Sequence, residues 1–175
     1  MTKDEEIWTP LPGEYCGPMK DMEYKVTPAT EDGSRWHEVL NRGRYKGYEY
    51  CIVSYGSYPC AYIAVPEGHP TNGMIWDDFY KKYSLGEHEA HGGFSFSCKS
   101  GWFVGEPWTF GWDYAHYGDY CCFRTITGDP WPRDPMESMY STEEVLDDVK
   151  NVIDGFVELF GALQEKTADV TAELT

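Results

Sequence analysis

The main helix signal of the sequence lies at residues 142–164, and most of the patterned chain before it is typical of strands. Ser141 and Glu144 form the Ser-x-x-Glu signature of a capping box, which marks the start of a helix. Gly155 and Gly161 weaken this helix but are not expected to end it. Its apolar face is formed by Val145, Val149, Val152, Phe156, Phe160 and Leu163. Because such a face must be buried against another element, the pattern predicts a helix packed on a sheet.

The strands of this sheet are predicted from runs of β-prone residues. Two such runs within residues 44–65, separated by a Gly/Ser break, predict an antiparallel hairpin. Pro66 and Pro70 end the hairpin, because proline cannot donate a hydrogen bond to the ladder. Residues 91–98 and 106–113 alternate aromatic and small side chains, as strands with one buried face do.

Three weaker signals complete the predicted elements. Residues 34–40 predict a short helix with Ser34 as its N-cap. Residues 74–84 predict a second short helix, because Ile75, Phe79 and Tyr83 share one helical face. A last strand is predicted from residue 120 to 126.

The chain length of 175 residues predicts one domain. Residues 1–33 are rich in proline, glycine and acidic side chains, and we expect an irregular arm there. Residues 34–165 form the domain, and residues 166–175 are expected to be a frayed tail. The fold class is therefore α+β, with an antiparallel sheet of about four to five strands and a long C-terminal helix packed on one face.

The charge of the chain narrows the choice of partners. With 14 Lys and Arg against 30 Asp and Glu, the net charge is −16, which argues against direct nucleic-acid binding and against an anionic membrane surface. It allows a protein with a basic surface as a partner. No run of 18 apolar residues is present, and the acidic N-terminus lacks the apolar region of a signal peptide, so we expect a cytoplasmic protein with its six cysteines as free thiols.

Two motifs give the candidate site. Residues 91–96 have the sequence His-Gly-Gly-Phe-Ser-Phe, and residues 108–119 have the sequence Trp-Thr-Phe-Gly-Trp-Asp-Tyr-Ala-His-Tyr-Gly-Asp. Each places a histidine beside small residues that let a ligand approach the backbone. The candidate ligand-binding residues are His91, Gly92, Gly93, Trp112, Asp113, His116 and Asp119.

Several chemistries remain open for these residues. The His/Asp set suits Zn²⁺ or a similar ion, although no helical His-x-x-x-His spacing is present; its members are His69, His91, His116, Asp113 and Asp119. The alternative is that His91 and His116 hydrogen-bond loop backbone at the strand ends. A bound phosphate would need nearby cations, for which the candidates are Arg42, Arg44, Lys46, Lys99 and Arg124. Nucleophilic catalysis would pair a histidine with Ser95, Cys98 or Cys121. We assign no metal ligands, and we expect no cofactor.

Together, the two motifs resemble those of a family of small proteins from tailed bacteriophages and prophages, mostly of unassigned function. That family carries His-Gly-Gly-hydrophobic-Thr/Ser-aromatic, followed by Trp-x-x-Gly-aromatic-Asp-x-Ala-His-x-Gly-Asp. An upstream Gly-His-Pro element is similar to residues 68–70, and the resemblance covers roughly residues 43–163. This chain departs from the pattern at Tyr114, where a cysteine often stands. The resemblance implies a phage origin and a role such as countering host defence, but it brings no activity.

These observations predict a phage-type binding protein of the host cytoplasm that inhibits host defence. It would either sequester a small polar or nucleotide-like ligand, or dock its acidic surface on a defence protein. The alternative is a small metal-dependent hydrolase that uses the His/Asp cluster, although the sequence favours binding over catalysis.

Overall fold

The computed structural model describes residues 38–54, 58–121 and 134–163. The predicted arm at residues 1–33, the predicted tail at residues 166–175 and residues 122–126 of the predicted last strand lie outside these ranges. The elements are β1 (Glu38–Tyr45), β2 (Tyr48–Ser54), β3 (Pro59–Val65), α2 (Trp76–Lys82), the 3-10 helix η1 (Gly86–His88), β4 (Phe96–Lys99), β5 (Trp108–Asp113) and α3 (Thr142–Phe160).

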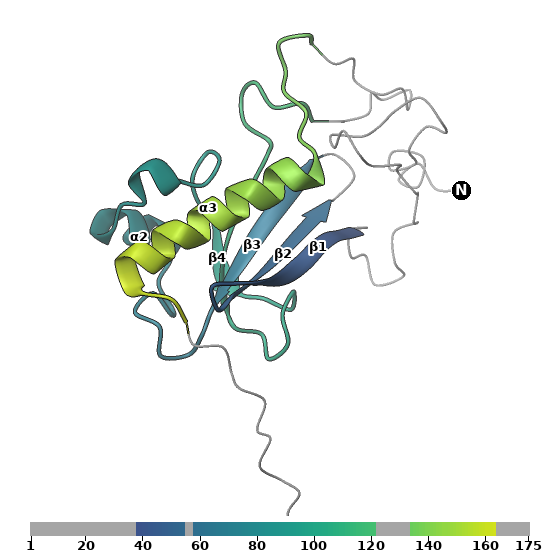
Figure 1. Cartoon of the computed structure of the whole chain (residues 1–175). Helices are drawn as coiled ribbons and strands as arrows, with labels where there is room; N and C mark the ends of the chain where they lie inside the picture. The colour runs from purple at the N-terminus through teal and green to yellow at the C-terminus, as the bar shows by residue number, and fades with distance from the viewer. Residues whose placement is uncertain (1–37, 55–57, 122–133, 164–175) are drawn as a thin grey trace, which may run out of the picture.

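The five strands form one antiparallel sheet in the order β1-β2-β3-β5-β4. Helix α3 lies across one face of this sheet, and the short helix α2 lies beside α3 (Figure 1). The predicted α+β class, the number of strands and the packed C-terminal helix are therefore confirmed. Among the described residues, no helix has both the length and the apolar character needed to cross a membrane.

The first hairpin of the sheet corrects two predictions. From Glu38 onward the chain is strand β1, so the helix predicted at residues 34–40 is wrong over its described part. The run from residue 44 to 53 is also not one strand, because Lys46 and Gly47 turn the chain between β1 and β2 with φ angles of 47° and 88°. This two-residue turn with positive φ at both positions has the twist that a hairpin needs.

The hairpin predicted within residues 44–65 is confirmed as β2 and β3. Tyr50 pairs with Ile63, and Ile52 pairs with Ala61. The side chains of these strands alternate between two buried clusters, one beneath α3 and one on the opposite face. The opposite cluster contains Cys51, Val53, Cys60, Tyr62, Ala64 and Phe103. Both faces of the central strands are therefore covered, which explains why β2 and β3 are buried almost without interruption.

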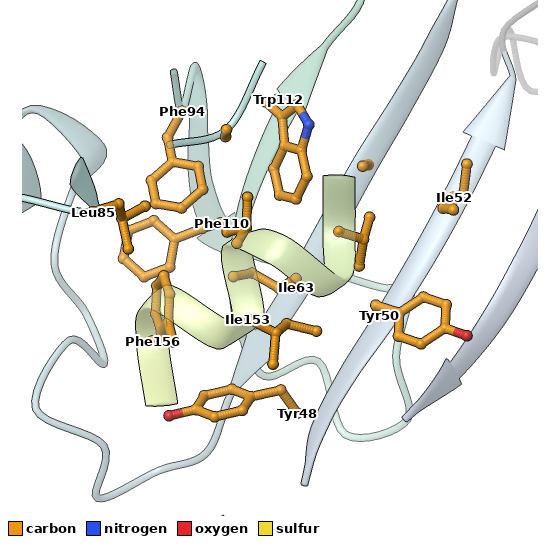
Figure 2. Packing of buried hydrophobic residues seen from close by; sticks show 14 of the residues in the cluster. Tyr48, Tyr50, Ile52, Ile63, Leu85, Phe94, Phe110, Trp112, Ile153 and Phe156 are labelled. Atoms are coloured by element: carbon orange, nitrogen blue, oxygen red, sulfur yellow. The ribbon is translucent and has the colours of Figure 1, made fainter. Parts of the chain in front are cut away.

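The main core is a set of aromatic rings between the sheet and α3 (Figure 2). Phe156 of α3 stacks on Phe79 of α2, with ring centroids 5.6 Å apart and an interplanar angle of 9°. Phe94 stacks on Phe110 of β5 at 5.2 Å. These contacts place α2 and the chain before β4 on the same side of the sheet as α3, so that all of them share one core.

Helix α3 begins as the sequence predicts and ends slightly earlier. The side chain of Ser141 accepts a hydrogen bond from the Glu144 N–H, and the Glu144 carboxylate accepts one from the Ser141 N–H. Gly161 caps the C-terminus with a φ angle of 84°, so the prediction that this glycine does not end the helix is wrong. Gly155 lies within the helix, where a Cβ atom would come within 2.7 Å of His88, and its small size lets η1 pack closely.

The remaining elements are shorter than predicted. The helix predicted at residues 74–84 is confirmed as α2, and the strands predicted at residues 91–98 and 106–113 are β4 and β5. Residues 91–95 do not pair as a strand, because Gly92 and Gly93 adopt φ angles of 69° and 82° in a turn. At the start of the predicted last strand, Asp119 and Ser138 form an isolated β-bridge, and the Tyr120 N–H donates to the Ser138 carbonyl. The described residues from 120 onward are not part of a strand.

His69 belongs to the core rather than to a site. Its ring is 7% exposed and packs against Phe156 and Phe160. Its Nδ1 accepts a hydrogen bond from the Thr71 N–H, and its Nε2 lies 3.0 Å from the Tyr48 hydroxyl. Burial lowers the pKa of His69 to about 4, so the folded protein holds this ring neutral.

The buried ring predicts that acid destabilises the protein between about pH 6.5 and pH 4. In that range the unfolded chain binds a proton at His69 that the folded chain does not, so the free energy of unfolding falls as the pH falls. We expect this one residue to contribute a loss of about 2 kcal/mol between pH 7 and pH 5, measured by urea unfolding. A His69→Gln variant should be less stable at pH 7 but should show a flatter pH dependence; equal slopes for the two proteins would contradict the assignment.

Candidate functional site

The end of β5 leads into a turn that presents one histidine and two carboxylates. Asp113 closes the strand, and its Oδ1 accepts a hydrogen bond from the Ala115 N–H. Asp119 folds back so that its Oδ2 accepts a hydrogen bond from the His116 N–H at 3.0 Å. The second motif therefore forms a turn in which the side chains of Asp113 and Asp119 accept hydrogen bonds from the backbone N–H groups of the turn itself.

The second histidine comes from the turn before β4. His91 is followed by Gly92, whose φ angle is 69°, and a Cβ atom at this glycine would lie 2.2 Å from Cε1 of His116. A side chain of any kind at residue 92 would therefore collide with the His116 imidazole. The Gly-Gly pair of the first motif lets the two turns approach each other until their histidines meet.

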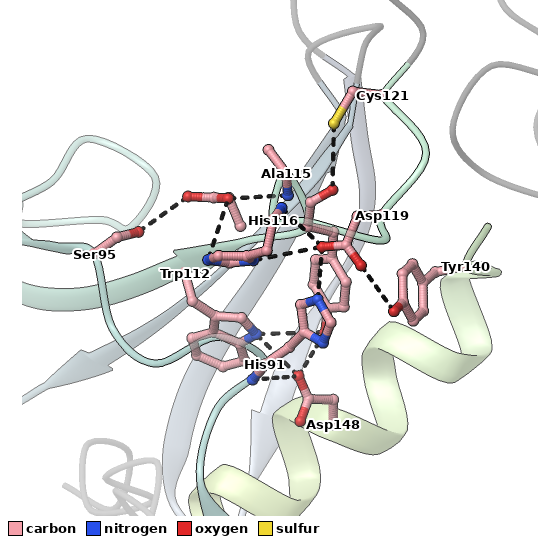
Figure 3. Close-up of polar contacts among 11 residues, drawn as sticks. His91, Ser95, Trp112, Ala115, His116, Asp119, Cys121, Tyr140 and Asp148 are labelled. Carbon is pink, nitrogen blue, oxygen red and sulfur yellow. Dashed lines mark hydrogen bonds and ion pairs between the residues drawn. The ribbon is translucent and has the colours of Figure 1, made fainter. Parts of the chain in front are cut away.

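The two turns form a cluster of His91, His116 and Asp119 (Figure 3). Nε2 of His91 lies 2.7 Å from Oδ2 of Asp119, and Nδ1 of His116 lies 3.4 Å from the same oxygen. One ligand-type atom from each residue can be chosen so that all of them lie within 4.8 Å of one another. Nδ1 of His116 is buried and finds no hydrogen-bond partner among the described residues.

The Asp119 carboxylate is the centre of this cluster, and its side chain is 4% exposed. Burial acts to raise its pKa, but hydrogen bonds from His91, from the His116 backbone and from Tyr140 outweigh burial and lower the pKa. The Tyr140 hydroxyl donates to Oδ1 at 3.0 Å, and its own pKa rises to about 12 because it is buried and faces this carboxylate. Asp119 is therefore held as an anion.

A second carboxylate, Asp148 of α3, connects the helix to both motifs. Its Oδ2 accepts hydrogen bonds from the Tyr114 hydroxyl at 2.6 Å and from the Trp112 indole N–H at 3.0 Å. It also lies 3.4 Å from the His91 N–H. The His91 ring stacks flat on Tyr114, with centroids 4.5 Å apart and an interplanar angle of 5°. Asp148 therefore fixes the aromatic support on which the His91 imidazole rests.

A pocket of about 370 Å³ opens beside the His91 ring. It is lined by Glu89, His91, Tyr114, Tyr140, Glu144 and Asp148. A second hollow of about 300 Å³ lies against Ser95, Phe96 and Asp113, toward the opposite face of the sheet. The first pocket is large enough for a small molecule, although its volume is at the lower end of the range that is usual for ligand pockets.

The structure brings some of the predicted site residues together and separates others. His91, Gly92, His116 and Asp119 meet in the cluster, as described above. Gly93 follows in the same turn and faces the Tyr80 hydroxyl. Trp112 is 2% exposed; its indole N–H donates to Asp148, and it also borders the second hollow beside Ser95 and Asp113. Asp113 lies at the far side of His116, with its Oδ1 4.0 Å from Nε2.

Other sequence candidates lie away from the cluster. His69 is in the core, Arg44 pairs with Glu49, and Lys46 pairs with Asp154. Arg42 lies near the Cys51 sulfur, Lys99 ends β4, and Arg124 is outside the described residues.

The candidate nucleophiles also have other surroundings. The Ser95 hydroxyl donates to Asp113, Cys98 is exposed on β4, and the Cys121 thiol contacts the Tyr114 carbonyl at 3.8 Å. A pairing of one of them with His91 or His116 stays a prediction that no described contact supports.

Sequence reasoning missed Glu89, Tyr114, Tyr140 and Asp148. Only Asp148 carries a clear signal. It occupies the same helical face as Val145 and Val152, where a carboxylate becomes partly buried and therefore needs hydrogen-bond donors. A charged residue within the apolar face of a predicted helix therefore marks a candidate site residue.

Comparison with protein-family models, with curated proteins and with solved structures finds no match to this chain. The resemblance to phage proteins therefore stays a prediction, and the case for a function rests on the geometry of the site.

The contact between the two turns predicts that Gly92→Ala destabilises the protein more than Gly118→Ala. Both glycines have positive φ, at 69° and 89°, but a Cβ atom at Gly118 would have nothing within 4 Å. We expect Gly118→Ala to lower the free energy of unfolding by about 1 kcal/mol because of backbone strain, and Gly92→Ala to lower it by about 3 kcal/mol. Urea unfolding measures both values. Equal losses would show that the His116 ring moves aside freely.

Proposed function

We propose that the chain is a binding protein that holds a small ligand in the pocket beside His91, and that this ligand is positively charged or rich in hydrogen-bond donors. One observation carries the proposal. Three carboxylates, from Glu89, Glu144 and Asp148, line the pocket, and no Lys or Arg is among its described lining residues. Such a wall attracts cations and donor groups and repels anions.

The carboxylates are held in place by the protein and keep acceptor atoms for a ligand. Oε1 of Glu89 accepts hydrogen bonds from the Tyr80 hydroxyl at 2.5 Å and the Ala90 N–H at 3.2 Å. The described hydrogen bonds of Asp148 all go to Oδ2. Oε2 of Glu89 and Oδ1 of Asp148 therefore have no described hydrogen bond and can accept from a ligand that enters the pocket. Preorganised acceptors of this kind reduce the entropic cost of binding.

This wall narrows the class of ligand expected from the sequence. A phosphate would bring negative charge against three carboxylates, and like charges brought together cost several kcal/mol. The cations that might offset this cost include Arg44 and Lys46, which pair with Glu49 and Asp154 instead. We therefore favour an amine, a guanidine or an uncharged nucleoside over a phosphorylated nucleotide.

The biological setting of the proposal comes from the motif resemblance. If the chain belongs with the small phage proteins that it resembles, sequestration of a host metabolite or signal in the cytoplasm would counter a host defence. The alternative of a small metal-dependent hydrolase that uses the His/Asp cluster stays a prediction as well.

Thermal unfolding in the presence of defined compounds tests the pocket. We expect agmatine, spermidine or adenosine to raise the midpoint of unfolding, because a ligand that binds only the folded state stabilises it. AMP, which differs from adenosine by the phosphate, should have a smaller effect than adenosine. Absence of a shift with all three compounds, or a larger shift with AMP than with adenosine, would contradict the proposed ligand class.

Two neighbouring substitutions provide the matched control. Asp148→Asn removes one of the three pocket charges but keeps an acceptor for Tyr114 and Trp112, so we expect it to reduce the shift clearly. Asp147→Asn removes one charge from an exposed position on the same helix and should leave the shift unchanged. Equal shifts in the two variants would place the ligand outside the pocket.

The second mode of binding, in which the acidic surface docks on a defence protein, is separated by its response to salt. A net charge of −16 would give such a complex an affinity that falls steeply with ionic strength. Binding in the pocket depends on short contacts and should depend less on salt. A salt-sensitive complex that tolerates Asp148→Asn would support the surface mode instead.

A further inference from the structure

We propose that His91, His116 and Asp119 form a binding site for one divalent transition-metal ion of the Zn²⁺ class, with two imidazole nitrogens and one carboxylate oxygen as ligands. This site is distinct from the carboxylate wall of the pocket, although His91 borders both. A bound metal ion would be a feature separate from the ligand in the pocket, and it can be detected directly by metal titration.

The distances within the cluster are close to those of a metal site. Bonds of about 2.0–2.1 Å from Zn²⁺ to nitrogen and oxygen place neighbouring ligand atoms about 3 Å apart. Nε2 of His91 and Nδ1 of His116 lie 2.7 Å and 3.4 Å from Oδ2 of Asp119. Ligand atoms of all three residues lie within 4.8 Å of one another, so rotation of the side chains would direct them at one ion.

The His116 imidazole supplies the observation that a simple hydrogen-bonded cluster leaves unexplained. Its Nδ1 is buried and has no hydrogen-bond partner in the described structure, although it lies near a carboxylate. A buried nitrogen without a partner is costly. An ion bound to the Nδ1 lone pair would satisfy this atom and would offset the negative charge of Asp119.

Two of the proposed ligands, His116 and Asp119, also have an outer neighbour that can orient them. Nε2 of His116 faces Oδ1 of Asp113 at 4.0 Å, and Asp113 is itself held by the Ser95 hydroxyl and the Ala115 N–H. The Tyr140 hydroxyl donates to Oδ1 of Asp119, the carboxylate oxygen that lies away from the histidines. Metal-binding histidines typically donate their second ring N–H to a carboxylate. Asp113 is placed for this role beside Nε2 of His116, although 4.0 Å is longer than a hydrogen bond.

The His91 ring is fixed by packing rather than by a hydrogen bond. It stacks on Tyr114, whose hydroxyl donates to Asp148 at 2.6 Å. The turn that carries it is kept close to His116 by Gly92, where there is no space for a Cβ atom. Rigid support of this kind preorganises ligands that come from separate turns.

The donor set identifies the class of ion. Imidazole suits Zn²⁺ and other first-row transition metals, whereas Ca²⁺ and Mg²⁺ prefer oxygen ligands. Two imidazoles and one carboxylate leave a position free on a four-coordinate ion, as in sites that bind water or a further ligand. No cysteine of the described part of the chain belongs to the cluster, so we expect the site to give no thiolate signature.

Metal titration of the full-length protein tests the inference. Protein freed of metal with EDTA is titrated with Zn²⁺ by calorimetry and with Co²⁺ by visible absorption. We expect one ion per chain, and we expect Co²⁺ to give ligand-field bands without the near-ultraviolet charge transfer of a thiolate. Absence of binding, or a thiolate band, would overturn the proposal.

Three variants locate the ion. We expect His116→Gln to weaken Zn²⁺ binding roughly 100-fold and Asp113→Asn to weaken it about tenfold, as for removal of a ligand and of its outer partner. His88→Gln is the control, because this histidine contacts Asn151 and Glu158 on another side of α3 and should leave the affinity unchanged. Wild-type affinity in both His116→Gln and Asp113→Asn would overturn the proposal. If His116→Gln fails to fold, the Zn²⁺ affinity of Asp113→Asn alone decides whether the proposal stands.

Discussion

The hydrogen bonds to the Asp148 carboxylate are the interaction on which the arrangement of the site depends. Burial of apolar area holds α3 against the sheet, but this driving force is non-directional and tolerates small shifts of a helix along its partner. Three donors from β5, from the residue that follows it and from the turn at His91 converge on one oxygen of Asp148. Partial burial of a carboxylate costs free energy unless such donors are in place. The position of α3 and the position of His91 are therefore fixed together.

Much of the fold could be predicted because its main signals are local and regular. The capping box at Ser141 and the apolar face of α3 are sufficient to place that helix, and the β-prone runs on either side of a Gly/Ser break are sufficient to place β2 and β3. The element that the sequence analysis did not predict is β1. The strand β1 was missed because its hairpin turn is Lys-Gly rather than the stronger Asn-Gly signal, and because Ser34 suggested a helix that pairing with β2 overrides.

The motifs located the cluster but not its surroundings. His91, His116 and Asp119 could be proposed from sequence because glycine and polar residues gather there, and the structure brings them within a few ångströms of one another. Asp148 and Tyr140 could not be joined to them, because contacts across 21 to 57 residues depend on how α3 lies on the sheet. His69 shows the converse case. It occurs in a motif-like Gly-His-Pro sequence, yet its role is to fill the core beside Phe156.

The missing side chain at Gly92 has a consequence for how the sequence can vary. The space that a Cβ atom would need at this position is filled by the His116 imidazole, 24 residues further along the chain. Neither residue can therefore be exchanged without regard to the other: a larger residue at 92 requires a smaller one at 116, together with a backbone that accepts it. In related chains the two positions should co-vary, and a histidine retained at 116 should be accompanied by glycine at 92.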